Sequence, residues 1–183
     1  MKKTAVIYWS GTGNTEAMAN AVLEGMTAAG ADAKLLTVDQ VNTAGLNGYA
    51  AIAFGCPAMG SEVLEEMEFQ PMFDACKNCL GGKAVALFGS YGWGDGEWMR
   101  SWEKDCADAG VNLVCDSVIC CEAPDDTALD ALRAMGKTLA ECPPLCSCAA
   151  ACGSAGRRCC RCWPFSSPQR CYTDEKHPLG QAA

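Results

Sequence analysis

The sequence has few basic residues and no long apolar run. Its 183 residues hold 14 Lys and Arg against 22 Asp and Glu, a net charge of −8. A general nucleic-acid binder is not expected, because neutralising phosphates requires clustered cations. The first apolar stretch, residues 5–9, is shorter than the roughly 7–15 residues of a signal-peptide core. The other runs fall far short of the roughly 20 residues that cross a bilayer. We therefore expect a cytoplasmic protein without membrane contact, whose thiols stay reduced.

The 15 cysteines are distributed unevenly along the chain. Seven fall in residues 1–140 and eight in residues 141–183, and the net charges of these parts are −10 and +2. The first part has the length of one ordinary domain. The second lacks apolar periodicity, so it buries too little apolar surface to offset the entropy of ordering. We expect a folded domain over residues 1–140 and a Cys-rich tail over residues 141–183 without a fold of its own.

The tail matches neither a ferredoxin nor a zinc-ribbon spacing. Cys146-x-Cys148 and Cys160-x-Cys162 leave a soft-metal site open as an alternative. The abrupt change in composition after Ala140 favours an extension of unusual origin, such as a reading-frame slip. We expect no metal site in the domain itself.

Short apolar runs alternate with longer amphipathic segments in residues 1–140. The runs predict strands over 4–8, 34–38, 49–54, 83–88 and 112–119. Helical spacing predicts helices over 15–29, 62–80, 96–109 and 127–140, with a short, weak helix over 41–46. This alternation indicates a doubly wound α/β domain, a five-stranded parallel sheet with helices on both faces. Ligands bind beyond the carboxyl ends of such strands, so the loops after the first, third and fourth strands form the candidate site.

The loop after the first predicted strand reads Ser10-Gly11-Thr12-Gly13-Asn14-Thr15 and opens a helix. Its glycines let the backbone approach a ligand, and unpaired N–H groups at a helix start favour an anion. The loop lacks the Lys of a Walker A motif and the third glycine of a G-x-G-x-x-G dinucleotide fingerprint. Neutral donors suit one terminal phosphate, as in a mononucleotide. The alternative is a helix-capping turn without a ligand.

The loops at residues 55–62 and 89–97 are rich in glycine and carry Met59, Tyr91 and Trp93. Because connections lie at the surface, large apolar side chains there predict a flat aromatic ligand held between the loops. The alternative is that Tyr91 and Trp93 fold back over the sheet edge as minor core. A phosphate at the first loop and a ring system between the other two together indicate FMN.

Three motifs resemble a known family. They are the nine residues from Tyr8 to Glu16, the six from Gly55 to Gly60 and the seven from Phe88 to Gly94. Over roughly residues 2–140 the sequence is similar to the short-chain bacterial flavodoxins. The resemblance implies a low-potential, one-electron carrier with non-covalent FMN, and not an enzyme. It implies these cofactor-binding residues: Ser10, Gly11, Thr12, Gly13, Asn14, Thr15, Pro57, Ala58, Met59, Gly60, Ser61, Glu62, Ser90, Tyr91, Gly92, Trp93, Gly94 and Gly96.

The resemblance also implies roles within that set. The first six residues hold the phosphate, Met59 and Trp93 flank the isoalloxazine, and the Met59–Gly60 peptide turns its carbonyl toward flavin N5. Gly60 suits that role because a residue without Cβ changes backbone conformation at low cost. The negative domain disfavours adding charge to the flavin, which predicts a low potential.

Acidic side chains near the flavin loops are expected to steer positively charged redox partners toward a monomeric carrier. They are Glu62, Glu65, Glu66, Glu68, Asp95 and Glu97. An ordinary solvated surface is the alternative. Two other functions stay open: a flavin-dependent quinone or nitro-reductase on the same fold, and a metal-binding protein acting through its tail. The segment Cys120-Cys121-Glu122 follows the fifth predicted strand, where the family's loop contacts the ring edge, and its role is left open.

Overall fold

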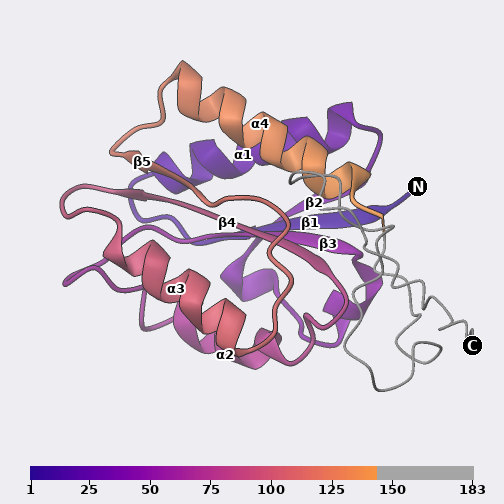
Figure 1. The fold of residues 1–183 in the computed structure, drawn as a ribbon, viewed down its shortest axis with the longest axis horizontal. Helices are drawn as coiled ribbons and strands as arrows, with labels where there is room; N and C mark the ends of the chain where they lie inside the picture. Colours follow the sequence, from indigo (N-terminus) through magenta and orange to yellow (C-terminus); the bar gives the residue numbers. More distant parts are fainter. Residues whose placement is uncertain (144–183) are drawn as a thin grey trace, which may run out of the picture. The chain divides into compact units, whose positions relative to one another are not determined.

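The computed structural model describes residues 1–143, which form five parallel strands and four α-helices (Figure 1). The strands are β1 (Lys3–Tyr8), β2 (Asp32–Thr37), β3 (Ala51–Gly55), β4 (Ala84–Tyr91) and β5 (Val118–Cys121). The α-helices are α1 (Asn14–Ala28), α2 (Phe69–Lys77), α3 (Glu97–Asp108) and α4 (Asp126–Glu141). Two short 3₁₀ helices, η1 (Val38–Gln40) and η2 (Gly45–Gly48), follow β2. Apart from its first three residues, the predicted tail lies outside the described residues.

The sheet has the strand order β2-β1-β3-β4-β5, with every pairing parallel. Figure 1 shows α1 and α4 on one face and α2 and α3 on the other. The doubly wound fold expected from the sequence is therefore confirmed. Strand order reverses between β1 and β3, and the crevice outside the carboxyl ends at such a reversal is where open α/β sheets bind ligands. Among the described residues, no helix has both the length and the apolar character needed to cross a membrane.

Aromatic side chains fill the core between the sheet and the α2–α3 layer. Phe73 packs edge-on against Phe54 and Trp102, with ring centroids 5.2 and 5.3 Å apart, and Phe69 meets Trp102 at 5.4 Å. All four side chains are buried. Edge-to-face pairs of this kind add to the free energy gained from burial alone, so this layer gives the loops above it a rigid base.

Two glycines let α1 and α4 approach closely on the opposite face. A Cβ built at Gly25 would lie 2.0 Å from the carbonyl oxygen of Arg133. One built at Gly136 would lie 2.1 Å from the carbonyl oxygen of Val22. Neither contact is sterically possible, so these two helices can lie this close only because both positions are glycine.

The helix predicted over residues 62–80 is wrong in its first half, because α2 begins only at Phe69. Glu62 has a φ of 53°, which a right-handed helix does not allow. Glu65 then turns its carboxylate onto the backbone N–H groups of Met67, Glu68 and Phe69, each at 2.8 Å. This carboxylate satisfies donors that a helix start leaves unpaired, which fixes the start of α2.

The strand predicted over residues 112–119 is also shorter than expected. Leu113 makes an isolated bridge to Val85, and the paired strand β5 begins only at Val118, opposite Phe88. The pairing register shifts by two residues between these contacts, so the intervening segment bulges out of the ladder. The short helix expected over residues 41–46 is replaced by η1, which ends just before this range, and by η2, which overlaps its last two residues.

Candidate functional site

The loop between β1 and α1 presents backbone donors at a helix start. Gly13 adopts a left-handed conformation, with φ 92°, and α1 begins at the next residue. Ser10 Oγ accepts a hydrogen bond from the Gly13 N–H at 3.0 Å. Within the described residues, the N–H groups of Thr12, Asn14 and Thr15 have no acceptor. Converging free N–H groups at the positive end of a helix dipole suit an anion.

A buried pair of hydroxyls ties this loop to the fourth strand. Thr15 Oγ1 and Ser90 Oγ lie 3.2 Å apart, and both residues are almost fully buried. Ser90 was expected in a loop, but β4 continues through it to Tyr91. The pair fixes the start of α1 against the end of β4, so the first and third candidate loops share one rigid base.

An open pocket of about 380 Å³ lies beside the start of the same loop, with Ser10 in its lining. Tyr8 and Trp9 line it together with three acidic residues, Glu16, Asp39 and Glu68. Burial and the neighbouring Glu16 carboxylate raise the pKa of Tyr8 above its ordinary value. Carboxylates repel a phosphate, so the anion site belongs to the helix start and not to this pocket.

The loop after β3 folds back on itself in a tight turn. Met59 and Val63 exchange two backbone hydrogen bonds, at 2.8 and 3.0 Å, which close a turn over Gly60, Ser61 and Glu62. Gly60 has a φ of 46°, and a Cβ there would meet no other atom within 4 Å. Space around this peptide leaves its conformation free to change, while Met59 stays 37% exposed.

Burial keeps the thiol at the base of this turn neutral. Desolvation raises the pKa of Cys56 to about 12, so Cys56 is not a nucleophile at neutral pH. Its sulfur accepts a hydrogen bond from the Glu65 N–H at 3.4 Å, and its carbonyl accepts one from Trp98 Nε1 at 3.3 Å. Cys56 therefore holds the turn in place as packed core.

The loop after β4 separates its two aromatic residues. Tyr91 packs against Trp98, with ring centroids 5.5 Å apart, and joins the core as the alternative interpretation expected for it. Trp93 remains 63% exposed. Gly94 and Gly96 both have φ above 90°, a conformation that residues with side chains rarely adopt. The loop thus holds Trp93 out of the core, where its ring can stack on a ligand.

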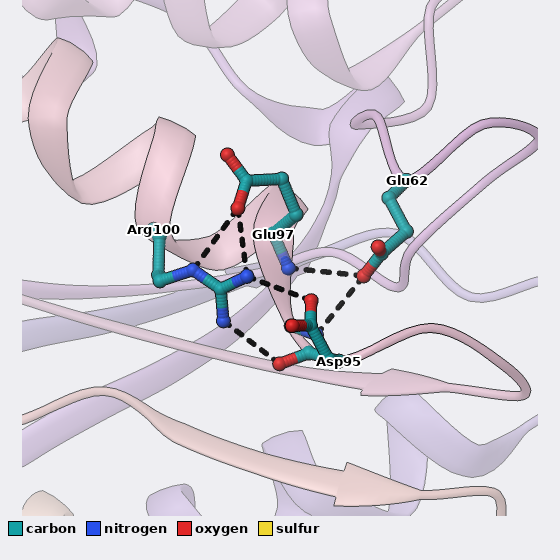
Figure 2. A network of polar contacts seen from close by, with 5 residues as sticks. Glu62, Asp95, Glu97 and Arg100 are labelled. Atoms are coloured by element: carbon teal, nitrogen blue, oxygen red, sulfur yellow. Dashed lines mark hydrogen bonds and ion pairs between the residues drawn. The ribbon is translucent and has the colours of Figure 1, made fainter.

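Glu62 connects the two ring-flanking loops (Figure 2). Its Oε1 accepts hydrogen bonds from the N–H groups of Gly96 and Glu97, at 2.9 and 3.0 Å, at the start of α3. Gly96 has no side chain to cap that helix, so the cap comes from another loop. This contact was not foreseen. The signal for it was the missing cap residue before a helix whose first turn needs acceptors.

Arg100 also binds residues at the start of α3. Its guanidinium contacts Asp95 Oδ1 and Glu97 Oε2, both at 2.7 Å, and donates to the Asp95 carbonyl at 2.8 Å. Sequence reasoning did not single out Arg100. The three-residue step from Glu97 to Arg100 on a helix was the available signal.

The segment after β5 lies beside the β4 loop. The N–H of Glu122 donates to the Tyr91 carbonyl at 2.7 Å, and Glu122 has a φ of 57°. Cys120 points toward Met18, with the two sulfurs 3.5 Å apart, whereas Cys121 is exposed. The two thiols lie on opposite faces of the strand, so they do not form a chelating pair. Within the described residues no cluster of three or more metal-ligating side chains occurs.

The structure brings the three predicted loops together at one end of the sheet, as their positions after β1, β3 and β4 required. Comparison with known proteins agrees with this arrangement. The family model for flavodoxin matches residues 6–136. The chain is 43% identical over 135 residues to a flavodoxin from Clostridium beijerinckii, covering 74% of this chain and 97% of that protein.

A second flavodoxin, from Megasphaera elsdenii, is 45% identical over 121 residues, covering 66% of this chain and 88% of its own length. The solution structure of two-electron reduced Megasphaera elsdenii flavodoxin superposes with a TM-score of 0.69 at 42% identity. It covers 75% of this chain and 98% of that one. With this fold, these three loops and relatives matched over nearly their whole length, the chain belongs to the flavodoxin family.

Proposed function

We propose that the chain carries single electrons at low potential between redox proteins, with FMN bound non-covalently at the ends of β1, β3 and β4. The observation that carries this function is the meeting of an anion-binding helix start with an exposed Trp and Met on two neighbouring loops. A phosphate and a flat ring joined by a short chain match these two features.

The phosphate is held by the loop at residues 10–15. Free N–H groups of Thr12, Asn14 and Thr15 bind its oxygens, and the Ser10 hydroxyl both orders the loop and adds a donor. No Lys or Arg occurs in this stretch. Neutral donors bind a terminal phosphate without adding a positive charge to the site, so the flavin keeps a low potential.

The ring lies between the turn at residues 57–62 and the loop at residues 90–96. Trp93 stacks on one face and Met59 packs on the other, which excludes water from the ring. FMN supplies the electron-accepting group, and the protein sets its surroundings. The Gly60 peptide has room to present its carbonyl to a flavin nitrogen that gains a proton.

The acidic face around these loops guides partner proteins that carry positive charge. Glu66 and Glu68 are exposed there, as are Asp95 on the Trp93 loop and Glu97 at the start of α3. Glu65 differs from them, since it is buried and bonded to three N–H groups, so it serves α2 and not a partner. A monomer that meets its partners transiently suits this role.

We place the protein in the cytoplasm. All eight cysteines of the described residues are free thiols, as expected in a reducing compartment. Residues 1–140 act as the electron-carrying unit, and the tail takes no part in binding FMN.

Stopped-flow reduction separates a carrier from a reductase on the same fold. Protein loaded with FMN is mixed anaerobically with NADH or NADPH, and flavin absorbance is followed. We expect reduction no faster than that of free FMN, because a carrier exchanges electrons with redox proteins and does not take hydride from a nicotinamide. Dithionite serves as the control and reduces the flavin in two separate steps. Saturable, rapid reduction by either nicotinamide would overturn the assignment.

A further inference from the structure

One cation stands among the acidic side chains of the two ring-flanking loops. In the stretches 55–68 and 89–103, Arg100 is the single basic residue against seven acidic ones. Its Nη2 lies 2.7 Å from both Asp95 Oδ1 and Glu97 Oε2, its Nε lies 3.1 Å from Glu97 Oε2, and its Nη1 reaches the Asp95 carbonyl. All three guanidinium nitrogens are therefore engaged at the end of the Trp93 loop (Figure 2).

A third carboxylate reaches the same helix start. Glu62 bonds the N–H groups of Gly96 and Glu97, and a Cβ at Gly94 would lie only 2.3 Å from its carboxyl carbon. Three carboxylates and one guanidinium thus gather where the two loops meet, leaving a local charge of −2. Removing Arg100 would leave all three without a cation in this network.

Arg100 keeps its charge under all ordinary conditions. Hydrogen bonds from its side chain to Asp95 and Glu97 hold the pKa of the guanidinium above its already high value. The Arg100 side chain is about half exposed and both carboxylates are more exposed, and ion pairs of that kind add little to stability. The effect of this arginine is therefore on the potential at the loops and on their geometry, with little effect on the free energy of unfolding.

We propose that Arg100 is a positioning residue that supplies the counter-charge of the FMN site and so limits how far the acidic loops depress the flavin's potential. The inference rests on the proposed function. A positive charge near the ring eases the addition of the second electron, which leaves the flavin with a net negative charge. By fixing Asp95, the same guanidinium also sets the path of the chain that follows Trp93.

The test is a spectroelectrochemical titration of the loaded protein and of the variant Arg100→Gln at low ionic strength. A unit charge acting over about 10 Å at an effective dielectric near 50 changes an equilibrium roughly threefold. We expect the ratio of fully reduced to one-electron-reduced protein, at a fixed ambient potential, to fall about threefold. For a one-electron couple this corresponds to about 28 mV.

Arg133 provides a matched control. It lies on α4, contacts Glu24 and Asp130 at 2.9 Å each, and is about as exposed as Arg100. Arg133→Gln changes the net charge by the same amount as Arg100→Gln but leaves the flavin loops unchanged. The flavin potential of this variant should therefore match that of the parent protein. Arg100→Lys keeps the charge but loses the planar fork, and it should retain most of the parent potential.

Salt gives a further readout that a merely structural role would not move. At 1 M salt the screening length shrinks to about 3 Å, so the difference between Arg100→Gln and the parent should largely disappear. Equal potentials for Arg100→Gln and Arg133→Gln at low salt would overturn the inference, as would an Arg100→Lys variant shifted as far as Arg100→Gln. If instead the parent protein takes up no FMN, the proposed function fails before this comparison is made.

Discussion

Several single side chains shape the site by bonding to an element other than their own. Glu62 belongs to the turn after β3 but caps α3, and Thr15 opens α1 but meets Ser90 on β4. Both contacts join segments far apart in the chain, so neither follows from local patterns. Glu65 was expected to face solvent as part of an acidic surface, yet it is buried and bonded to three backbone N–H groups.

The bonding of Glu65 predicts how the free energy of unfolding depends on pH. Burial raises the pKa of its carboxyl, but the N–H groups of Phe69, Met67 and Glu68 outweigh this effect and lower it below the ordinary value. A lowered folded-state pKa gives stability that is present above the unfolded value of about 4.3 and is lost as pH falls through the folded value. Glu65→Gln should therefore lower the free energy of unfolding at pH 7 by about 1–2 kcal/mol.

Urea denaturation of the two proteins between pH 7 and pH 3 measures this effect. The gap between parent and Glu65→Gln should narrow as the pH drops, because the parent carboxylate becomes protonated and loses its advantage. Glu66→Gln, at an exposed neighbour, is the control and should leave the free energy of unfolding within about 0.5 kcal/mol. A gap that stays constant with pH would contradict the assigned role.

Whole elements were predictable where a periodic pattern coincided with a clear end signal. α1, α3 and α4 lie within about a residue of their predicted ranges, since apolar spacing defined their faces and a glycine lies two residues beyond the ends of α1 and α3. The start of α2 and the length of β5 were not predictable in this way. The turn closed by Met59 and Val63 delays the start of α2, and a two-residue shift in pairing register shortens β5.

The candidate site divides along the same line. The three loops could be located because strand ends in a parallel sheet meet at one edge, and that edge depends only on the order of strands and helices. The sequence did not predict which side chains form hydrogen bonds between the loops. Glu62 and Arg100 bond to backbone groups whose positions depend on the exact path of the chain. The left-handed conformations at Glu62 and Glu122 had no sequence signal either, since neither residue is a glycine.

The packing of α1 on α4 predicts a sensitive position. Gly136→Ala would place a methyl group 2.1 Å from the Val22 carbonyl oxygen, so the helices must separate. Overpacking of this kind costs about 1–3 kcal/mol, and thermal unfolding should detect it as a lower Tm. Gly81→Ala, where a Cβ meets no atom within 4 Å, should be nearly neutral. A Gly136→Ala variant as stable as the parent would show that the two helices do not depend on this contact.

At the scale of the whole molecule, charge and cysteine separate into two parts. Residues 1–140 hold a net charge of −10 and align with relatives over nearly those relatives' full length. Lys2 donates to the carbonyl oxygens of Leu139, at 2.7 Å, and of Cys142, which anchors the end of α4 beside β1. The two ends of the described fold are thus held together by hydrogen bonds between Lys2 and the end of α4.

Truncation after Pro143 tests whether the electron-carrying unit needs the rest of the chain. The cut keeps the contacts of Lys2 and removes residues 144–183, which hold seven of the 15 cysteines. We expect unchanged FMN affinity and unchanged potentials in the shortened protein, measured by fluorescence titration and spectroelectrochemistry beside the full chain. A shift of potential or a loss of FMN on truncation would give the removed segment a part in the site.

The most direct measurement is a titration of the flavin-free protein with FMN, following flavin emission. Stacking on Trp93 should quench the emission strongly and give a saturable, one-to-one curve. Trp93→Ala should bind about tenfold more weakly and restore part of the emission. Met67→Ala, which removes an exposed side chain of the neighbouring loop, should match the parent. Unchanged FMN emission with the parent protein, and no flavin retained after gel filtration, would contradict the account.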